Sequence, residues 1–190
     1  MRNKDELKQQ AIIDATINLV NEIGFVACSV SKIAKKADVS PATLYVYYKN
    51  KEDLLVSTYI EIKQLFGRKL LNNFDDTLPI RDILKNLWFN IFMFTQKSPE
   101  YFQFTEQFSN SPFSELVDQE KVERNFEPIY QIILKGIDQK IIKNVSFDII
   151  SAFIFFPAMT LSNKKFCKSF EPTPDHIETA FNLAWDAIKY

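Results

Sequence analysis

Hydrophobic residues recur along this chain at the three- and four-residue spacing of α-helices, and the alternation that is typical of β-strands never persists. Glycine, which punctuates helices, occurs only 3 times in 190 residues, so few breaks are expected inside the helices. The pattern predicts an all-α fold of about nine helices. The first helix is expected to end at Gly24 and to bury one face made of Ile12, Ala15, Leu19, Val20 and Ile23.

Two short helices are expected next, joined by a tight turn at Asp38. Ser29 or Ser31 is suited to cap the first of them. Ser40 followed by Pro41 is a typical helix start, because a serine side chain accepts a hydrogen bond from the first turn and proline fits the first helical position. Two short helices around a tight turn predict a helix-turn-helix.

The second of these short helices has two chemically distinct faces. Leu44 and Tyr48 lie one turn apart and are expected to face the core, whereas Thr43, Val46 and Tyr47 share the opposite face. In the major groove a thymine methyl group suits valine, and threonine bonds to either type of base, while a tyrosine hydroxyl reaches phosphate oxygens. The outer face therefore indicates a helix that reads DNA.

The distribution of charge favours the same interpretation. The whole chain has a formal net charge of -1 at pH 7, yet residues 28–51 contain only one acidic residue, Asp38, and five basic ones. These five, which would attract a phosphate backbone, are Lys32, Lys35, Lys36, Lys49 and Lys51. Capped helical hairpins are common and a lysine cluster is usually a solvated face, so spacing alone leaves DNA binding open.

This part of the chain resembles the N-terminal DNA-binding domain of the TetR family of bacterial transcriptional regulators. The resemblance is carried by residues 29–55, SVSKIAKKADVSPATLYVYYKNKEDLL, and begins upstream at AIIDATINLVNEIGF. It implies a DNA-binding domain in residues 1–50 and an effector-binding and dimerisation domain in residues 51–190. It further implies base-edge contacts from Ala42, Thr43 and Val46. The phosphate contacts that it implies come from Ser29, Ser40, Tyr45, Tyr47 and Lys51.

Two residues depart from the family pattern. Asp38 stands in the turn where family members usually carry glycine, and aspartate tolerates the left-handed conformation better than most residues. Tyr48 replaces the more usual phenylalanine, so its hydroxyl is expected to reach water. Neither departure changes the assignment.

The rest of the chain is rich in aromatic residues. Residues after position 55 include 17 of the 18 phenylalanines. A helical bundle packed with large side chains explains this, but so does an aromatic-lined cavity for a small molecule, and the resemblance supports the cavity. The charge of such an effector stays open, because Glu100 and Glu106 suit a cation but fit a solvated position equally well. The candidate effector-binding residues are Trp88, Phe92, Tyr101, Phe104, Phe108, Tyr130 and Phe155.

The last two helices are expected to carry an apolar surface. Members of the TetR family usually pair through these helices, so the resemblance implies a homodimer. Packing within one chain is the alternative use of the same residues. The candidate dimer-interface residues are Ile150, Phe153, Ile154, Phe181 and Trp185.

The sequence contains no motif for catalysis, metal binding or a cofactor. His176 is the one histidine, and Cys28 and Cys167 do not have the spacing of metal ligands. The two cysteines are therefore expected to be reduced thiols. The N-terminus lacks the apolar core of a signal peptide, and the longest apolar run, residues 149–161, is too short to span a bilayer. We therefore expect a cytoplasmic protein that is no enzyme, needs no cofactor and does not contact a membrane.

The resemblance implies a DNA-binding transcriptional regulator whose partners are double-stranded operator DNA, a small-molecule effector and a second copy of the chain. The favoured function is a repressor that is released from its operator by a small apolar or aromatic effector. The alternative is an architectural or division-linked DNA-binding protein that has no effector. The two differ in whether any metabolite changes the affinity for DNA, and the sequence does not choose between repression and activation.

Overall fold

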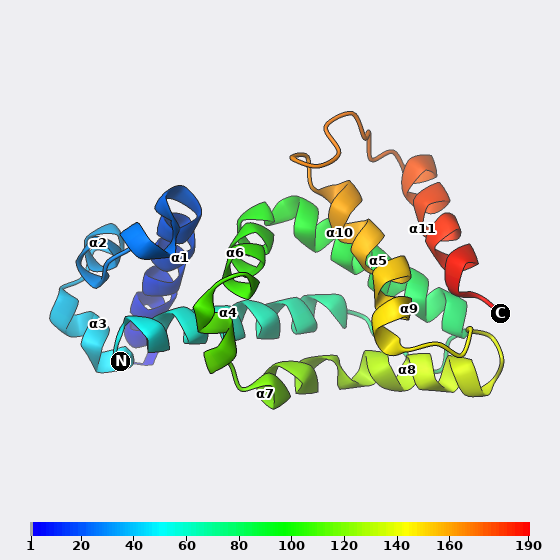
Figure 1. Cartoon of the computed structure of the whole chain (residues 1–190), viewed down its shortest axis with the longest axis horizontal. Helices are drawn as coiled ribbons and strands as arrows, with labels where there is room; N and C mark the ends of the chain where they lie inside the picture. The colour runs from blue at the N-terminus through cyan, green and yellow to red at the C-terminus, as the bar shows by residue number, and fades with distance from the viewer. Residues whose placement is uncertain (1) are drawn as a thin grey trace. The chain divides into compact units, whose positions relative to one another are not determined.

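The computed structural model describes residues 2–190, with side chains for residues 5–190, and confirms the all-α fold (Figure 1). These residues form no strand, and one isolated antiparallel bridge joins Ile142 to Lys189. Two short 3-10 helices, η1 (Pro112–Leu116) and η2 (Arg124–Phe126), accompany the α-helices. The α-helices are α1 (Arg2–Ala27), α2 (Val30–Lys36), α3 (Pro41–Tyr47), α4 (Lys51–Leu70), α5 (Ile80–Lys97), α6 (Pro99–Ser109), α7 (Gln119–Glu123), α8 (Glu127–Asp138), α9 (Phe147–Ile154), α10 (Phe156–Ser162) and α11 (Pro174–Ile188).

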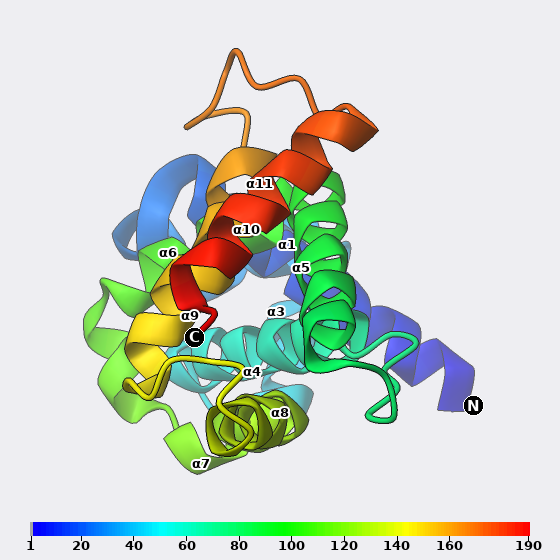
Figure 2. The same cartoon turned by 90° about the vertical axis from the view of Figure 1, so that its right-hand side faces the viewer.

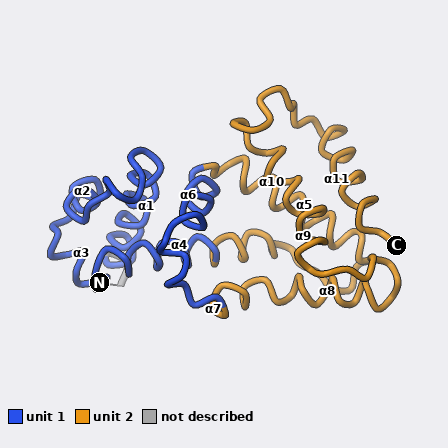
Figure 3. Tube along the Cα trace, in the orientation of Figure 1, with its two compact units in different colours: residues 1–63, 100–119 blue, residues 64–99, 120–190 orange. Residues whose placement is uncertain are grey.

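The chain divides into two compact units (Figure 3). The first unit contains residues 1–63 and 100–119, and the second contains residues 64–99 and 120–190. Helix α4 begins in the first unit and ends in the second. The predicted domain boundary between residues 50 and 51 stays a prediction.

The first unit buries the predicted apolar face of α1 against α2. Ile12 and Val20 are fully buried, and so is Ile33 of α2, each contributing about 1.5 to 3 kcal/mol by leaving water. Gly24 breaks α1 as predicted, because its φ of 73° lies in the left-handed region. The prediction for Ile23 was wrong: its side chain is 41% exposed, because the apolar face stops where the helix breaks at the next residue.

The core of the second unit is formed by α5, α8, α9, α10 and α11. Helix α10 packs on α5, and α11 packs on α9 (Figure 2). Trp88 and Phe92 of α5 stack with their ring centroids 5.7 Å apart, and Phe181 of α11 meets Trp88 edge-on at 6.2 Å. At the rim of this core, Arg81 Nη2 donates a hydrogen bond to Asn182 Oδ1 at 2.7 Å. Helix α11 is therefore fixed to the unit by both apolar and polar contacts.

Candidate nucleic-acid interface

The turn between α2 and α3 has the conformation that the sequence predicted. Asp38 adopts a φ of 54°, in the left-handed region that aspartate tolerates. The backbone N–H of Val39 donates to the carbonyl of Ala34 at 3.0 Å, which closes the end of α2. The start of α2 is held by Ser29, whose Oγ accepts a hydrogen bond from the Lys32 N–H at 3.3 Å. The predicted helix-turn-helix is therefore present, with Ser29 rather than Ser31 as the cap.

Helix α3 begins at the expected cap. Ser40 Oγ accepts a hydrogen bond from the Thr43 N–H at 3.0 Å and lies 2.9 Å from Thr43 Oγ1, while Pro41 occupies the first turn. Leu44 is fully buried, as predicted, and anchors the helix to the unit. These contacts fix the orientation of a helix that is only seven residues long.

The outer face of α3 exposes apolar side chains. Val46 is 78% exposed and Tyr45 is 55% exposed. Ala42 is also exposed, whereas Thr43 and Tyr47 are half-buried. Because the valine and tyrosine side chains are largely exposed, they form an apolar surface that suits a binding partner. Their predicted contacts with DNA stay a prediction.

The prediction that the Tyr48 hydroxyl reaches water was wrong. Tyr48 caps the C-terminus of α3 and is buried beside the Gln9 side chain of α1. Burial raises the pKa of its phenol, and the neighbouring Gln9 offsets part of the rise. The phenol is enclosed because the packing of α1 against the helix-turn-helix covers the position, which a motif comparison of α3 alone does not reveal.

The side chain of Tyr47 is held by a residue that sequence reasoning missed. Its hydroxyl donates a hydrogen bond to Asp5 Oδ1 of α1 at 3.2 Å. Desolvation and the Asp5 carboxylate together raise the pKa of the Tyr47 phenol. Because 42 positions separate the two residues, no local sequence signal indicates this contact. A predicted phosphate ligand is thus bonded to a carboxylate in the protein without DNA.

Two of the five clustered lysines bind the end of α1. Lys51 Nζ donates to the carbonyl of Phe25 at 2.6 Å, and Lys32 Nζ donates to the carbonyl of Ala27 at 3.0 Å. Ammonium groups at a helix C-terminus satisfy free carbonyls and interact favourably with the helix dipole. Lys51, a predicted phosphate contact, therefore also has a structural role in the first unit.

The candidate effector-binding residues of the second unit do not form one cluster. Trp88, Phe92 and Phe155 are buried in its core, where Trp88 and Phe92 stack. Tyr130 of α8 lies at the surface instead and packs edge-on against Phe147 at 5.5 Å. The indole Nε1 of Trp88 is buried and has no hydrogen-bond partner in the described part of the chain.

The candidate effector-binding residues of the first unit lie on α6. Phe104 and Phe108 are fully buried and meet Phe25 edge-on at 5.8 and 6.1 Å, whereas Tyr101 is half-buried. Tyr59 of α4 stacks on Phe108 with ring centroids 4.4 Å apart. Sequence reasoning missed Phe25 because it precedes the aromatic-rich part of the chain, and it missed Tyr59 because spacing within α4 does not reveal that its ring stacks on α6.

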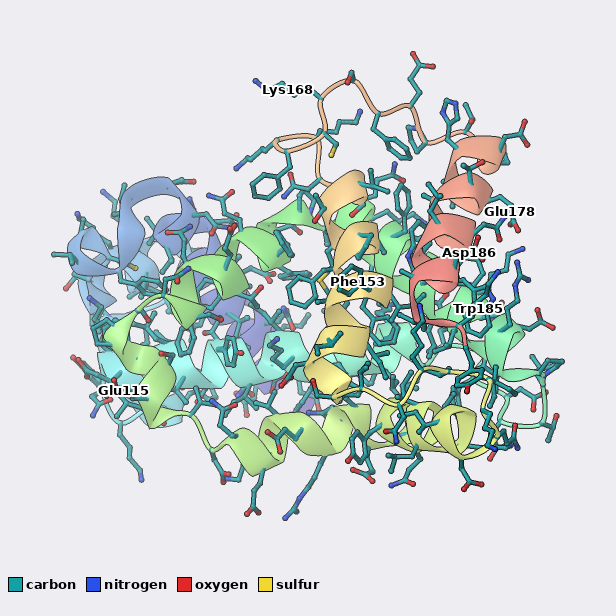
Figure 4. All side chains as sticks on the ribbon, turned by 45° about the vertical axis from the view of Figure 1, so that its right-hand side comes forward. Glu115, Phe153, Lys168, Glu178, Trp185 and Asp186 are labelled. Carbon is teal, nitrogen blue, oxygen red and sulfur yellow. The ribbon has the colours of Figure 1, made fainter. Side chains whose placement is uncertain are left out.

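An open groove of about 720 Å³ lies on the surface of the second unit. Its walls include Phe153 of α9, Pro157 of α10 and Leu183 of α11. Phe153 is 56% exposed and Leu183 is 68% exposed. Figure 4 shows Phe153 and Trp185 on α9 and α11, the two helices that flank the groove.

Four of the five candidate dimer-interface residues face the core of their own chain. Ile150, Ile154, Phe181 and Trp185 are buried, and only Phe153 is exposed. An apolar stripe in the sequence does not show which of its residues are buried within the same chain. The residues chosen from the sequence are mostly those that face the core of their own unit. The exposed apolar residues nearby include Leu183 and Phe156, which sequence reasoning did not single out.

Other kinds of site find no support in residues 2–190. This part of the chain holds no group of three or more His, Cys, Asp and Glu side chains placed to bind a metal ion. In the same range no helix has both the length and the apolar character needed to cross a bilayer. Cys28 is buried and Cys167 is half-buried, and neither forms a disulfide.

Known proteins and family models match this chain along nearly its whole length. A family model described as "Bacterial regulatory proteins, tetR family" matches residues 12–58, and one described as "Tetracyclin repressor-like, C-terminal domain" matches residues 79–189. A TetR family transcription regulator of Marinobacter aquaeolei has 36% sequence identity and a TM-score of 0.90, with 100% of this chain and 99% of that chain covered.

Two further relatives differ in how much of the chain they cover. An uncharacterized HTH-type transcriptional regulator of Haemophilus influenzae is 28% identical over 187 residues, which are 98% of this chain and 97% of that protein. A fatty acid metabolism regulator protein of Bacillus subtilis is 48% identical over 54 residues, which are 28% of each chain. The second likeness is therefore strong but local.

Proposed function

Because the chain belongs to the TetR family of bacterial regulatory proteins and is a DNA-binding transcriptional regulator, we propose that it is a repressor released from its operator by a small apolar or aromatic effector. The observation that carries the DNA-binding part is the outer face of α3, where Val46 and Tyr45 are exposed on a helix whose inner face is buried. Exposed apolar groups on a rigidly held short helix suit base edges in a major groove.

In this proposal the residues of the helix-turn-helix have two kinds of role. Ala42, Thr43 and Val46 contact base edges and determine the sequence that is bound. The remaining residues position the protein on the backbone without reading sequence. These phosphate-binding residues are Ser29, Ser40, Tyr45, Tyr47 and Lys51.

We infer that the groove of the second unit is covered by a second copy of the chain. Phe153 and Leu183 are too exposed for core residues and lie in the walls of one groove. In a two-fold dimer the same surface meets itself, so a ridge at Leu183 and a groove beside it are compatible with self-association. Two recognition helices would then read two half-sites of one operator.

The effector would act through α4. This helix runs without interruption from Lys51 to Leu70 and contains residues of both units. A small molecule that shifts α4 therefore changes the position of Lys51 at the start of the helix. Coupling between two sites is reciprocal, so operator DNA should weaken effector binding by the same factor, typically ~5 to 150-fold.

A second candidate function is an architectural or division-linked DNA-binding protein without an effector. The full burial of Phe92, Phe104 and Phe108 favours it, because side chains that are already packed do not need a ligand to cover them. The two candidates differ in one measurable quantity, the change in DNA affinity on adding a small molecule.

The experiment that tests the proposal begins by selecting duplexes that the protein retains from a random-sequence pool. Affinity is then measured for a selected and a scrambled duplex at several salt concentrations. A regulator should prefer the selected duplex by a factor on the order of 10³ or more, whereas a non-specific binder should show equal affinities. Release of the selected duplex by members of a lipophilic compound library would support the effector, and its failure throughout would favour the architectural candidate.

A further inference from the structure

Helix α4 carries a half-buried lysine without a counter-ion. Among the described side chains, residues 5–190, no group forms a hydrogen bond or an ion pair with Lys63 Nζ, which lies 5.4 Å from the centroid of the Tyr59 ring. Burial lowers the pKa of the Lys63 ammonium, and no carboxylate in the described chain opposes that shift. A positive charge that is partly removed from water and has only the face of one tyrosine ring as a partner is weakly compensated, so a bound anion would stabilise it.

The surroundings of this ammonium are aromatic. Tyr59 stacks on Phe108 at 4.4 Å, Phe108 lies 6.0 Å from Phe104, and Phe25 meets both phenylalanines edge-on. Lys63 thus adjoins one end of a continuous set of rings.

We propose that Lys63 binds the anionic head group of an amphipathic effector, whose apolar part lies beside the ring of Tyr59. The inference rests on the proposed function, because it names the chemical class of the effector. An ammonium donates charge-assisted hydrogen bonds to carboxylate or phosphate oxygens, and these are stronger than bonds between neutral groups. Of the two acids that would suit a cation, Glu106 is exposed and Glu100 is half-buried. The half-buried charge that lies against the ring of Tyr59 is the positive one of Lys63.

The first arm of the test compares three probes that share an alkyl chain and differ in head group. Decanoate, decanol and decylammonium are titrated into the unaltered full-length protein by calorimetry, and each is then added to the complex with a selected duplex. We expect decanoate to bind tightest, by about tenfold or more over decanol, and to release the duplex. Decylammonium should bind weakest, because like charges repel at Lys63.

The second arm replaces the lysine while keeping its bulk. Lys63→Met should lower the affinity for decanoate by about tenfold and leave that for decanol unchanged. Lys69→Met, an exposed lysine on the same helix, is the matched control and should change neither affinity. Because Lys63→Met removes a half-buried charge, the melting temperature should stay equal or rise, so that lost binding cannot be ascribed to unfolding.

The outcomes separate this inference from the proposed function. If decanol or decylammonium binds as tightly as decanoate and releases the duplex, the effector stands but its anionic class is overturned. The anionic class is likewise overturned if Lys63→Met and Lys69→Met bind decanoate equally. If none of the three probes binds while members of the lipophilic library still release the selected duplex, the inference fails and the effector survives. If no compound of either set releases the duplex while the unaltered protein still prefers its selected sequence, the effector and the inference both fail and DNA recognition survives.

Discussion

Helices α3 and α11 begin in the same way. Ser40 and Pro41 start α3, and Thr173 and Pro174 start α11. In each case the hydroxyl oxygen accepts a hydrogen bond from an N–H three residues later, at 3.0 Å in α3 and 3.2 Å in α11. Helix α3 then buries Leu44, and α11 buries a row of apolar side chains, each in its own unit. The start of a helix and its inner face therefore obey the same physics in both units.

The outer faces of the two helices differ. On α3 the exposed Val46 follows the hydroxyls of Ser40 and Thr43, in a segment rich in lysine. On α11 the exposed Leu183 adjoins alanines at positions 180, 184 and 187, which line an apolar groove. A mixed polar and apolar face with nearby positive charge suits nucleic acid, whereas an apolar ridge beside a groove suits protein. Caps therefore specify a helix, whereas its outer residues specify its partner.

The largest effect is expected from placing a charge on the outer face of α11. Leu183→Glu should reduce self-association on the order of 100-fold, because a carboxylate would be buried without a partner in the proposed dimer. Folding should survive, since Leu183 is 68% exposed in the single chain. Sedimentation at micromolar concentration measures the change from dimer to monomer.

A matched control keeps the chemistry of this substitution and changes its location. Leu134→Glu alters another exposed leucine of the second unit, on α8, and should leave the dimer intact. A Leu183→Glu protein that sediments as a dimer would show that α11 does not meet a partner through this face. The apolar outer face of α11 would then not be a protein-binding surface, and it could not be contrasted in function with the outer face of α3.

Helices α3 and α11 also differ in how far the sequence alone was informative. The hydroxyl and proline pairs predicted both helix starts, and spacing alone assigned Leu44 of α3 to the core, because those signals are local. In α11, Phe181 and Trp185 were assigned to a dimer interface although both are buried in their own unit. Both rows of that helix are apolar, and periodicity cannot distinguish a row covered by its own chain from one covered by a partner.

The outer face of α3 should respond to a change in the identity of one base-reading side chain. Thr43→Ala should cost about 1 to 3 kcal/mol on the selected duplex and much less on a scrambled one. The Thr43 N–H still donates to Ser40 Oγ, so the cap of α3 is kept. Titrations of both duplexes measure the two affinities. Equal losses on both would mean that this residue positions the helix and that α3 is turned differently on DNA.

Helix α1, which packs beside the helix-turn-helix, has a backbone break at Gly24, and α11 has no such break. Gly24 has a φ of 73°, and a Cβ added there would meet nothing within 4 Å, so Gly24→Ala adds strain without a clash. We expect a loss of about 1 to 2 kcal/mol in the free energy of unfolding. Ala27→Gly, an exposed change nearby in the same helix, is the control for altered flexibility. Unchanged stability of Gly24→Ala in a denaturant titration would show that the chain relaxes to another conformation.

The smallest effect is expected where α1 meets the outer face of α3. Tyr47 donates its hydroxyl hydrogen to Asp5 in the protein without DNA, so a phosphate must replace a carboxylate that remains close by and repels it. Asp5→Asn keeps an acceptor for Tyr47 and removes the charge. Affinity for DNA should therefore rise, by less than about tenfold, and the gain should shrink as salt screens the repulsion.

Because phosphates carry no sequence information, the selected and the scrambled duplex should gain equally from Asp5→Asn. Asp14→Asn, another exposed acid of α1, should change neither affinity. A gain confined to the selected duplex would place Tyr47 at a base edge instead of the backbone. A loss on both duplexes would mean that Asp5 aligns the phenol for its phosphate, and the outer face of α3 would then depend on α1 for its geometry as well as its charge.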